Sequence, residues 1–113
     1  MKQKDTPRFA ARLNAFKIGS ETYWPGKNSI TTTDLLARAA TAGVNAADLN
    51  YPDHFMDDSP ADLLKALGDS GMILNGIAMR YYTEPGYKLG AFTHPNTVVR
   101  RAAIDETKRG LDV

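Results

Sequence analysis

The sequence contains one pattern twice, about 28 positions apart, and this repeat restricts the folds open to the chain. The run Asp34-Leu-Leu-Ala-Arg-Ala-Ala-Thr-Ala-Gly43 aligns without gaps with Asp62-Leu-Leu-Lys-Ala-Leu-Gly-Asp-Ser-Gly71. Each copy has an acid and two leucines at a helix start, and a glycine at a left-handed helix end. An apolar segment follows each glycine directly. General capping rules alone can make two helices look alike, but the passage from glycine to strand favours true βα units.

Helix and strand signals alternate along the chain. A helix is predicted from Asp34 to about Ala42, capped by Thr32 or Thr33, and a second begins at Ser59 with Pro60 at its first position. The expected strands are Leu13–Gly19, Val44–Asn50 and the mostly apolar Met72–Met79, and a long loop, Arg80–Leu89, follows the third. This alternation predicts a parallel sheet with right-handed crossovers.

An amphipathic helix is predicted at the end of the sequence, starting after Asn96, a suitable N-cap. Its apolar arc includes Val98, Ala103 and Leu111, and Arg100 interrupts that arc. A buried arginine needs a carboxylate or carbonyl partner, so we expect Arg100 to form a structural ion pair that fixes this helix to the rest of the fold. No C-cap residue follows this helix in the sequence, and we therefore expect it to be cut off in its last turns.

Three βα units do not close a sheet, and this leaves two architectures. A (β/α)8 barrel needs about 250 residues, and the sequence has 113. Either a small open α/β layer forms, with a bare face and bare edges, or the chain is the N-terminal part of a barrel. We favour the second architecture. Residues 13–113 are then the first three βα units of a TIM barrel, with parallel strands and outer helices, and residues 1–12 are a leader.

Composition excludes several classes of protein. Without cysteine there is no disulfide framework, thiolate metal site or cysteine nucleophile. A net charge of +1 argues against a dedicated nucleic-acid binder. The charged N-terminus has no apolar signal region, and no apolar run approaches the roughly 20 residues of a membrane span. We therefore expect a cytoplasmic protein that binds neither nucleic acid nor membrane. The sequence also lacks a glycine-rich phosphate loop and a nucleophile elbow.

Three segments carry a family likeness. They are Gly90-Ala-Phe-Thr with Asn96 and Val99-Arg-Arg-Ala102, then Tyr82-Thr-Glu-Pro85, and finally Gly43-Val44 leading into Asp48-Leu-Asn-Tyr-Pro52. The first resembles the third helix region of the xylose isomerase-like (β/α)8 barrel superfamily. The second is similar to the loop that leaves the third strand of xylose isomerases. The third resembles the second strand and its exit in sugar isomerase and epimerase relatives.

This resemblance implies an enzyme of carbohydrate metabolism that interconverts an aldose and a ketose, or epimerises a ketose. A divalent metal, Mg²⁺, Mn²⁺ or Co²⁺, would polarise the substrate oxygens. The metal ligands of the family lie on later strands, so none is expected here, and we expect the 113-residue chain alone to be inactive. Its expected partners are a small sugar and further copies of itself.

The sequence departs from xylose isomerase at two positions and agrees with it at a third. Asn50 stands where that enzyme has its catalytic histidine and Glu84 where its loop has a histidine, whereas Asp53 stands where it has the orienting aspartate. A related sugar isomerase with another substrate therefore fits better than xylose isomerase itself.

Four residues are predicted to contact the sugar. Asn50 and His54 follow the second strand, so in a barrel they would face the catalytic mouth, although both also suit an ordinary loop. Trp24 and Tyr82 are loop aromatics that suit either stacking on a sugar face or closing the core.

Two alternative functions stay open. The superfamily also contains endonuclease IV-like nucleases, against which the near-neutral charge counts. A non-catalytic α/β module that acts by binding or oligomerising is the other alternative, and an exposed apolar face would favour it.

Overall fold

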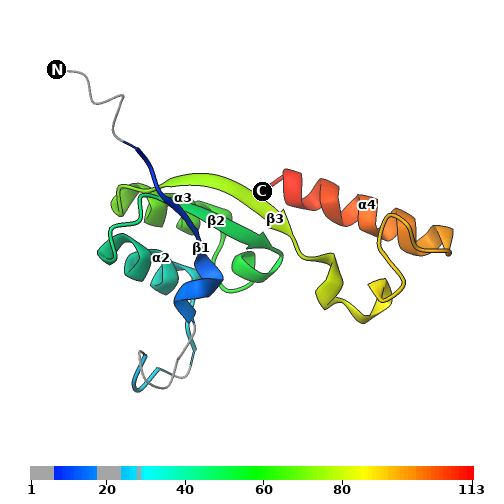
Figure 1. Ribbon diagram of the computed structural model, residues 1–113, viewed down its shortest axis with the longest axis horizontal. Coiled ribbons are helices and arrows are strands. Elements are labelled where there is room, and N and C mark those ends of the chain that lie inside the picture. The colour runs from blue at the N-terminus through cyan, green and yellow to red at the C-terminus, as the bar shows by residue number, and fades with distance from the viewer. Residues whose placement is uncertain (1–6, 18–23, 28) are drawn as a thin grey trace.

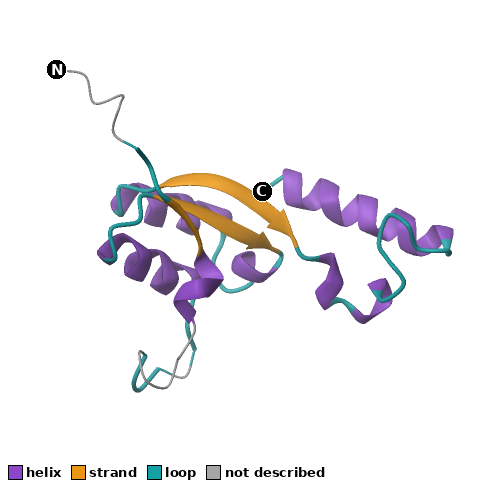
Figure 2. Ribbon diagram, in the orientation of Figure 1, coloured by secondary structure: helices purple, strands orange, loops and turns teal. Residues whose placement is uncertain are grey.

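A computed structural model describes residues 7–17, 24–27 and 29–113, and its architecture is α/β with a three-stranded parallel sheet. The strands are β1 (Ala10–Arg12), β2 (Ala46–Tyr51) and β3 (Ile73–Met79), hydrogen-bonded in that order. The helices are α2 (Thr32–Thr41), α3 (Pro60–Asp69) and α4 (Thr97–Leu111). Short 3-10 turns complete the fold: η1 (Leu13–Lys17), η2 (Asp53–Phe55), η3 (Tyr81–Thr83) and η4 (Pro85–Tyr87). The predicted parallel βα arrangement is confirmed (Figures 1 and 2).

Both copies of the repeat begin as capped helices. The Thr31 side chain accepts a hydrogen bond from the Asp34 N–H, and the Asp34 carboxylate accepts one from the Thr31 N–H. Ser59 caps α3 in the predicted way, accepting from the Asp62 N–H at 3.1 Å. The N-cap of α2 is therefore Thr31, and not Thr32 or Thr33 as predicted. Thr32 already lies within the helix, and its hydroxyl donates to the His54 carbonyl.

Both copies also end in the same way. Gly43 and Gly71 adopt left-handed backbone angles, with φ of 90° and 67°. Beyond them, the Val44 N–H donates to the Ala39 carbonyl at 3.1 Å, and the Met72 N–H donates to the Leu67 carbonyl at 2.9 Å. These are the bonds of a Schellman motif, which satisfies the last helix carbonyls and turns the chain back towards the sheet. The glycine positions of the repeat were thus predicted correctly.

The first strand was predicted wrongly. The segment Leu13–Gly19 was expected to be a strand, but Leu13–Lys17 forms η1 and the strand is Ala10–Arg12, inside the segment assigned to the leader. Residues 18 and 19 lie outside the described residues. Leu13 is fully buried, and Phe16, three residues later, packs against the same core. A spacing of three suits one side of a 3-10 turn rather than one face of a strand.

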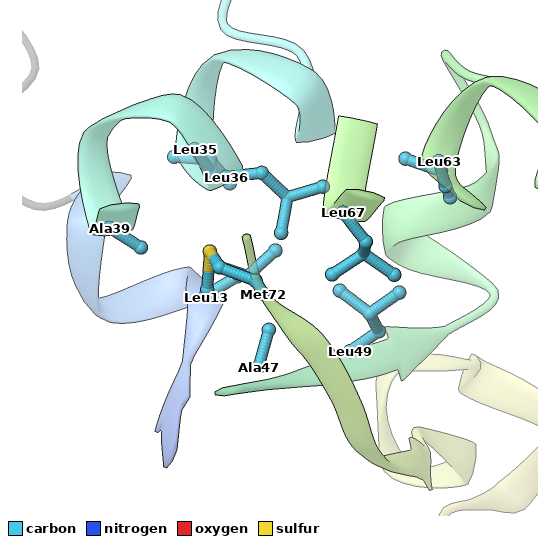
Figure 3. Packing of buried hydrophobic residues seen from close by; sticks show 9 residues of the cluster. All are labelled: Leu13, Leu35, Leu36, Ala39, Ala47, Leu49, Leu63, Leu67 and Met72. Carbon is cyan, nitrogen blue, oxygen red and sulfur yellow. The ribbon is translucent and has the colours of Figure 1, made fainter. Parts of the chain in front are cut away.

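The core lies between the sheet and the pair α2 and α3 (Figure 3). Ala47 and Leu49 of β2 face the helices, as alternation along a strand requires. The full cluster of buried residues is Leu13, Leu35, Leu36, Ala39, Ala47, Leu49, Leu63, Leu67 and Met72. The alternate residues Asp48 and Asn50 belong to the opposite face, where Asn75 donates a hydrogen bond to Asp48 at 2.8 Å.

The last helix approaches the sheet only near its C-terminal end, beside β3 (Figure 1). A Cβ at Gly110 would lie 2.6 Å from the Met79 Sδ and 3.3 Å from a Tyr51 ring carbon, so a larger residue here would have to push the end of the Met79 side chain aside. Ala103 and Gly110 are buried, but Val98 and Leu111 of the predicted apolar arc are exposed. The amphipathic arc was therefore only partly correct.

The end of α4 lies at Leu111, and Asp112 is the next residue, with its N–H donating to the carbonyls of Lys108 and Arg109. These are ordinary bonds of the last helical turn. That the helix is cut off in its last turns stays a prediction. Within the ranges that the structure describes, no helix combines the length and apolarity that crossing a bilayer demands.

The packing of α3 predicts a contrast between two adjacent leucines. Leu63 is 2% exposed, whereas Leu64 is 73% exposed. We expect Leu63→Ala to lower the free energy of unfolding by about 2–5 kcal/mol, because it removes core contacts and leaves a cavity. Leu64→Ala makes the same change in helix propensity and should cost about 0.5 kcal/mol or less. Urea unfolding followed by circular dichroism measures both, and equal losses would contradict this packing.

Candidate functional site

A cleft of about 180 Å³ opens at the carboxyl end of the parallel strands. Its walls come from η1, the start of α2, the segment after β2 and the residue after β3. The lining residues are Asn14, Lys17, Ile30, Thr32, Leu35, Asn50, Asp53, His54, Asp57 and Arg80. Open parallel sheets bind ligands outside the carboxyl ends of their strands. The cleft is smaller than the roughly 300–1,000 Å³ sites of drug-sized ligands, so it suits a small molecule.

His54 is held in the cleft by one hydrogen bond to its side chain and one to its backbone carbonyl. Its Nδ1 accepts a hydrogen bond from the Asn50 N–H at 2.7 Å, and its carbonyl accepts one from the Thr32 hydroxyl at 2.7 Å. β1 pairs with β2 no further than Asp48, so the Asn50 N–H has no partner in β1, and His54 takes that place. The site is thus built by the end of β2 and the first turn of α2 together.

These bonds fix the chemical state of the imidazole. Because Nδ1 is an acceptor, the neutral ring carries its proton on Nε2 and offers it as a donor. Burial lowers the pKa of His54 below its ordinary value, and the positive charges of Arg80 and Lys17 lower it further. Asp53 acts in the opposite direction. His54 is therefore a neutral hydrogen-bond donor at pH 7.

Asn50 is the most buried polar residue of the cleft. It is 1% exposed, although it belongs to the face of β2 opposite the helices. It lies next to the end of β2 and lines the cleft with His54 and Asp53. An amide offers both a donor and an acceptor, and both are useful towards a hydroxyl group.

Arg80 follows the last residue of β3 and brings a positive charge into the cleft. Its backbone N–H donates to the Tyr51 carbonyl at 2.9 Å, which extends the pairing of β2 with β3 by one step. Its Nη1 lies 3.7 Å from an Asp53 carboxylate oxygen, and its guanidinium lies 4.7 Å from the centre of the Tyr82 ring. The side chain is 18% exposed. A separation of 3.7 Å is an ion pair without a hydrogen bond.

Two of the four predicted site residues meet in this cleft. Asn50 and His54 both line it, as their position after a strand suggested. Tyr82 lies outside the lining, exposed, with its ring beneath the Arg80 guanidinium. Trp24 donates its indole N–H to the Phe16 carbonyl at 3.0 Å, contacts the Arg38 guanidinium at 3.7 Å and packs against the core. The geometry of Trp24 is that of core closure rather than of a sugar platform.

Arg100 has a structural role, but not through the ion pair that the sequence suggested. Its guanidinium donates to the carbonyls of His94 and Pro95 at 2.7 and 3.0 Å, and to the Thr97 hydroxyl at 2.9 Å. The partner is therefore backbone carbonyl and not a carboxylate. Arg100 ties the loop before α4 to the first turn of that helix and lies outside the cleft lining.

Sequence reasoning missed several residues of the cleft, Arg80, Asp57, Asn14 and Lys17 among them. Arg80 was assigned only to a loop, although it follows β3 directly and the rule that identified Asn50 applies to it equally. Asn14 and Lys17 were missed because their segment was predicted to be a strand, whereas η1 folds them over the carboxyl end of the sheet.

The described residues do not build a divalent-metal site. Nowhere in the described ranges do three or more histidine, aspartate or glutamate side chains come together in a way that would hold a metal ion. In the cleft, the Nδ1 of His54 is already engaged by the backbone.

The sequence matches no protein-family model and no curated protein.

The environment of His54 predicts a measurable pKa below the ordinary 6.5. The unfolded chain takes up a proton near pH 6.5, and the folded ring resists it, so stability present above pH 6.5 is lost as the pH falls from there through the folded-state pKa. NMR titration of the imidazole nitrogens gives the pKa directly. Arg80→Gln should raise the pKa of His54, and Asp53→Asn should lower it further. A wild-type value at or above 6.5 would contradict the buried, neutral imidazole.

Proposed function

We propose that this chain forms the sugar-binding mouth of an aldose–ketose isomerase or epimerase of the xylose isomerase-like barrel type. One observation carries the proposal: a cleft at the carboxyl end of a parallel sheet is lined by neutral and charged groups that suit several hydroxyls. His54 and Arg80 donate, Asp53 and Asp57 accept, and Asn50 does both. A polyhydroxylated ligand needs donors and acceptors at close spacing, and an apolar ligand would leave these groups unpaired.

The parallel sheet and the place of the cleft support a barrel-type parent. In TIM barrels the active site lies at the carboxyl ends of the strands, and here the cleft residues follow β1, β2 and β3 at that same end. The resemblance places the metal ligands on later strands of such a barrel. We therefore propose that these residues bind and orient the sugar, that a divalent metal supplies the polarisation in the complete site, and that the chain alone has no turnover.

The proposal predicts sugar binding without catalysis. Titrating the 113-residue protein with a panel of aldoses and ketoses, followed by NMR, should shift the signals of Asn50 and His54. His54→Gln and Asp53→Asn should each weaken binding about tenfold, the usual loss for one hydrogen bond to a charged or buried group.

The matched control is His94→Gln, which changes a histidine outside the cleft lining and should bind as the wild type does. The sugar proposal is lost if no sugar of the panel shifts the cleft signals at millimolar concentration. Turnover by the chain alone would contradict the assignment of the metal to other residues.

A second proposal concerns self-association. Two adjoining hollows of about 260 and 320 Å³ flank β3, one against α3 and one against the end of α4. Both are lined by Leu74, Ile77 and Val113, and their walls are mostly apolar. The outer edge of β3 pairs with no strand in the described part of the chain. Apolar surface beside an open strand edge favours association, and we propose a second copy as its partner.

Sedimentation velocity tests this association. We expect the sedimentation coefficient to rise with protein concentration, and Leu111→Glu to keep the protein monomeric, because Leu111 is exposed at the rim of the second hollow. Leu89→Glu places the same charge on an exposed leucine that lines neither hollow, and should associate as the wild type does. A concentration-independent monomer, or equal effects of both variants, would refute this surface.

A further inference from the structure

The cations of the cleft carry information about the ligand beyond its hydroxyl groups. Lys17 comes from η1 and Arg80 from the residue after β3, and both line the cleft with His54. Their charges both act on His54, since each lowers the pKa of that ring. One cation from the turn after β1 and one from the residue after β3 thus line the same cleft as a neutral imidazole, which itself offers a hydrogen-bond donor.

Arg80 is held in place more firmly than a surface arginine. Its backbone is tied to Tyr51, its guanidinium lies over the Tyr82 ring, and only 18% of its side chain is exposed. Such a side chain has already lost most of its rotamer freedom, so a ligand that binds it pays little further entropy. This pre-organisation is typical of an anchoring residue rather than of a solvated charge.

The hydrogen-bonding capacity of Arg80 is not used up. Its Nε is buried and has no hydrogen-bond partner within the described residues. The neighbouring Asp53 carboxylate lies 3.7 Å from Nη1, too far for a hydrogen bond, and Asp53 is 40% exposed. Because the Nε itself is closed to solvent, an oxygen of a bound ligand would meet the Nη groups, which make no hydrogen bond with Asp53.

We propose that Arg80, assisted by Lys17 and the His54 Nε2–H, is the anchor for an anionic group of the ligand, so that the substrate class is a sugar bearing a carboxylate or a phosphate. This inference rests on the proposed sugar-binding function and narrows it. The anionic group lies at the Arg80 end of the cleft, and the hydroxyl groups of the same sugar contact Asn50, Asp53 and Asp57. An arginine fork matches a planar carboxylate or a phosphate with two parallel bonds. Asp53 competes for Arg80 in the free protein and turns to the hydroxyls when the ligand binds.

The test compares ligands that differ in charge. Calorimetry and NMR titration with D-glucuronate, D-glucose 6-phosphate, D-glucose and inorganic phosphate measure the four affinities at low and high salt. We expect the charged sugars to bind at least about tenfold more tightly than D-glucose, and this advantage to shrink as the salt rises. Whichever charged sugar binds more tightly identifies carboxylate or phosphate as the anionic group.

Variants of Arg80 locate the effect. Arg80→Gln should remove the advantage of the charged sugars, whereas Arg80→Lys, which keeps the charge but not the fork, should retain part of it. Arg101→Gln removes one exposed arginine outside the cleft lining and should bind all four probes as the wild type does. An amide correlation spectrum of Arg80→Lys that matches the wild type shows that the fold is intact.

The outcomes separate this inference from the function on which it rests. Equal affinity for charged and neutral sugars overturns the anion anchor and leaves sugar binding standing. Arg80-dependent binding of phosphate, without binding of any sugar, confirms the anion site and overturns the sugar proposal. Binding of charged sugars that survives Arg80→Gln overturns the role of Arg80.

Discussion

The burial of β2 between its neighbours is the constraint on which the rest of the structure depends. Ala47 and Leu49 are sealed beneath α2 and α3, and the strand is flanked on both edges. Burying these side chains supplies the main driving force of the fold, and the two Schellman turns deliver the chain to the sheet in the right direction. Because a strand alternates its faces, fixing Leu49 towards the helices also fixes Asn50 towards the other face, where it lines the cleft. The position of the cleft is thus a consequence of packing in the core.

The local features of the repeat were predictable because they depend on residues close in sequence. A serine or threonine with an aspartate three positions later, and a glycine eleven residues after the first helical residue, act through bonds within one turn. β1 was not predictable in the same way. Leu13 and Phe16 read as part of an apolar segment, and only the surrounding core decides that they lie on one side of a turn. The same holds for α4, since its sequence shows an apolar arc but not the Met79 and Tyr51 side chains that Gly110 contacts.

The cleft was half predictable. The rule that functional residues follow parallel strands identified Asn50 and His54, and the structure places both in one cleft. Arg80 obeys the same rule, because it follows β3 directly. Lys17 depends on the position of η1, a tertiary fact. Trp24 shows the opposite error, because an aromatic on a loop says nothing of whether its ring will pack inwards.

The hydrogen bond from the Asn50 N–H to His54 has a consequence for how this protein could change over time. The bond belongs at once to the end of the central strand and to the cleft. Any residue that replaces His54 must therefore offer an acceptor at the same point, or leave a buried backbone donor unpaired. Substitutions that change ligand specificity are much less constrained at Lys17, whose side chain makes no hydrogen bond to the core backbone in the described part of the chain. New ligand specificities should therefore arise by substitution of exposed cleft residues such as Lys17, while the buried pair Asn50 and His54 stays unchanged.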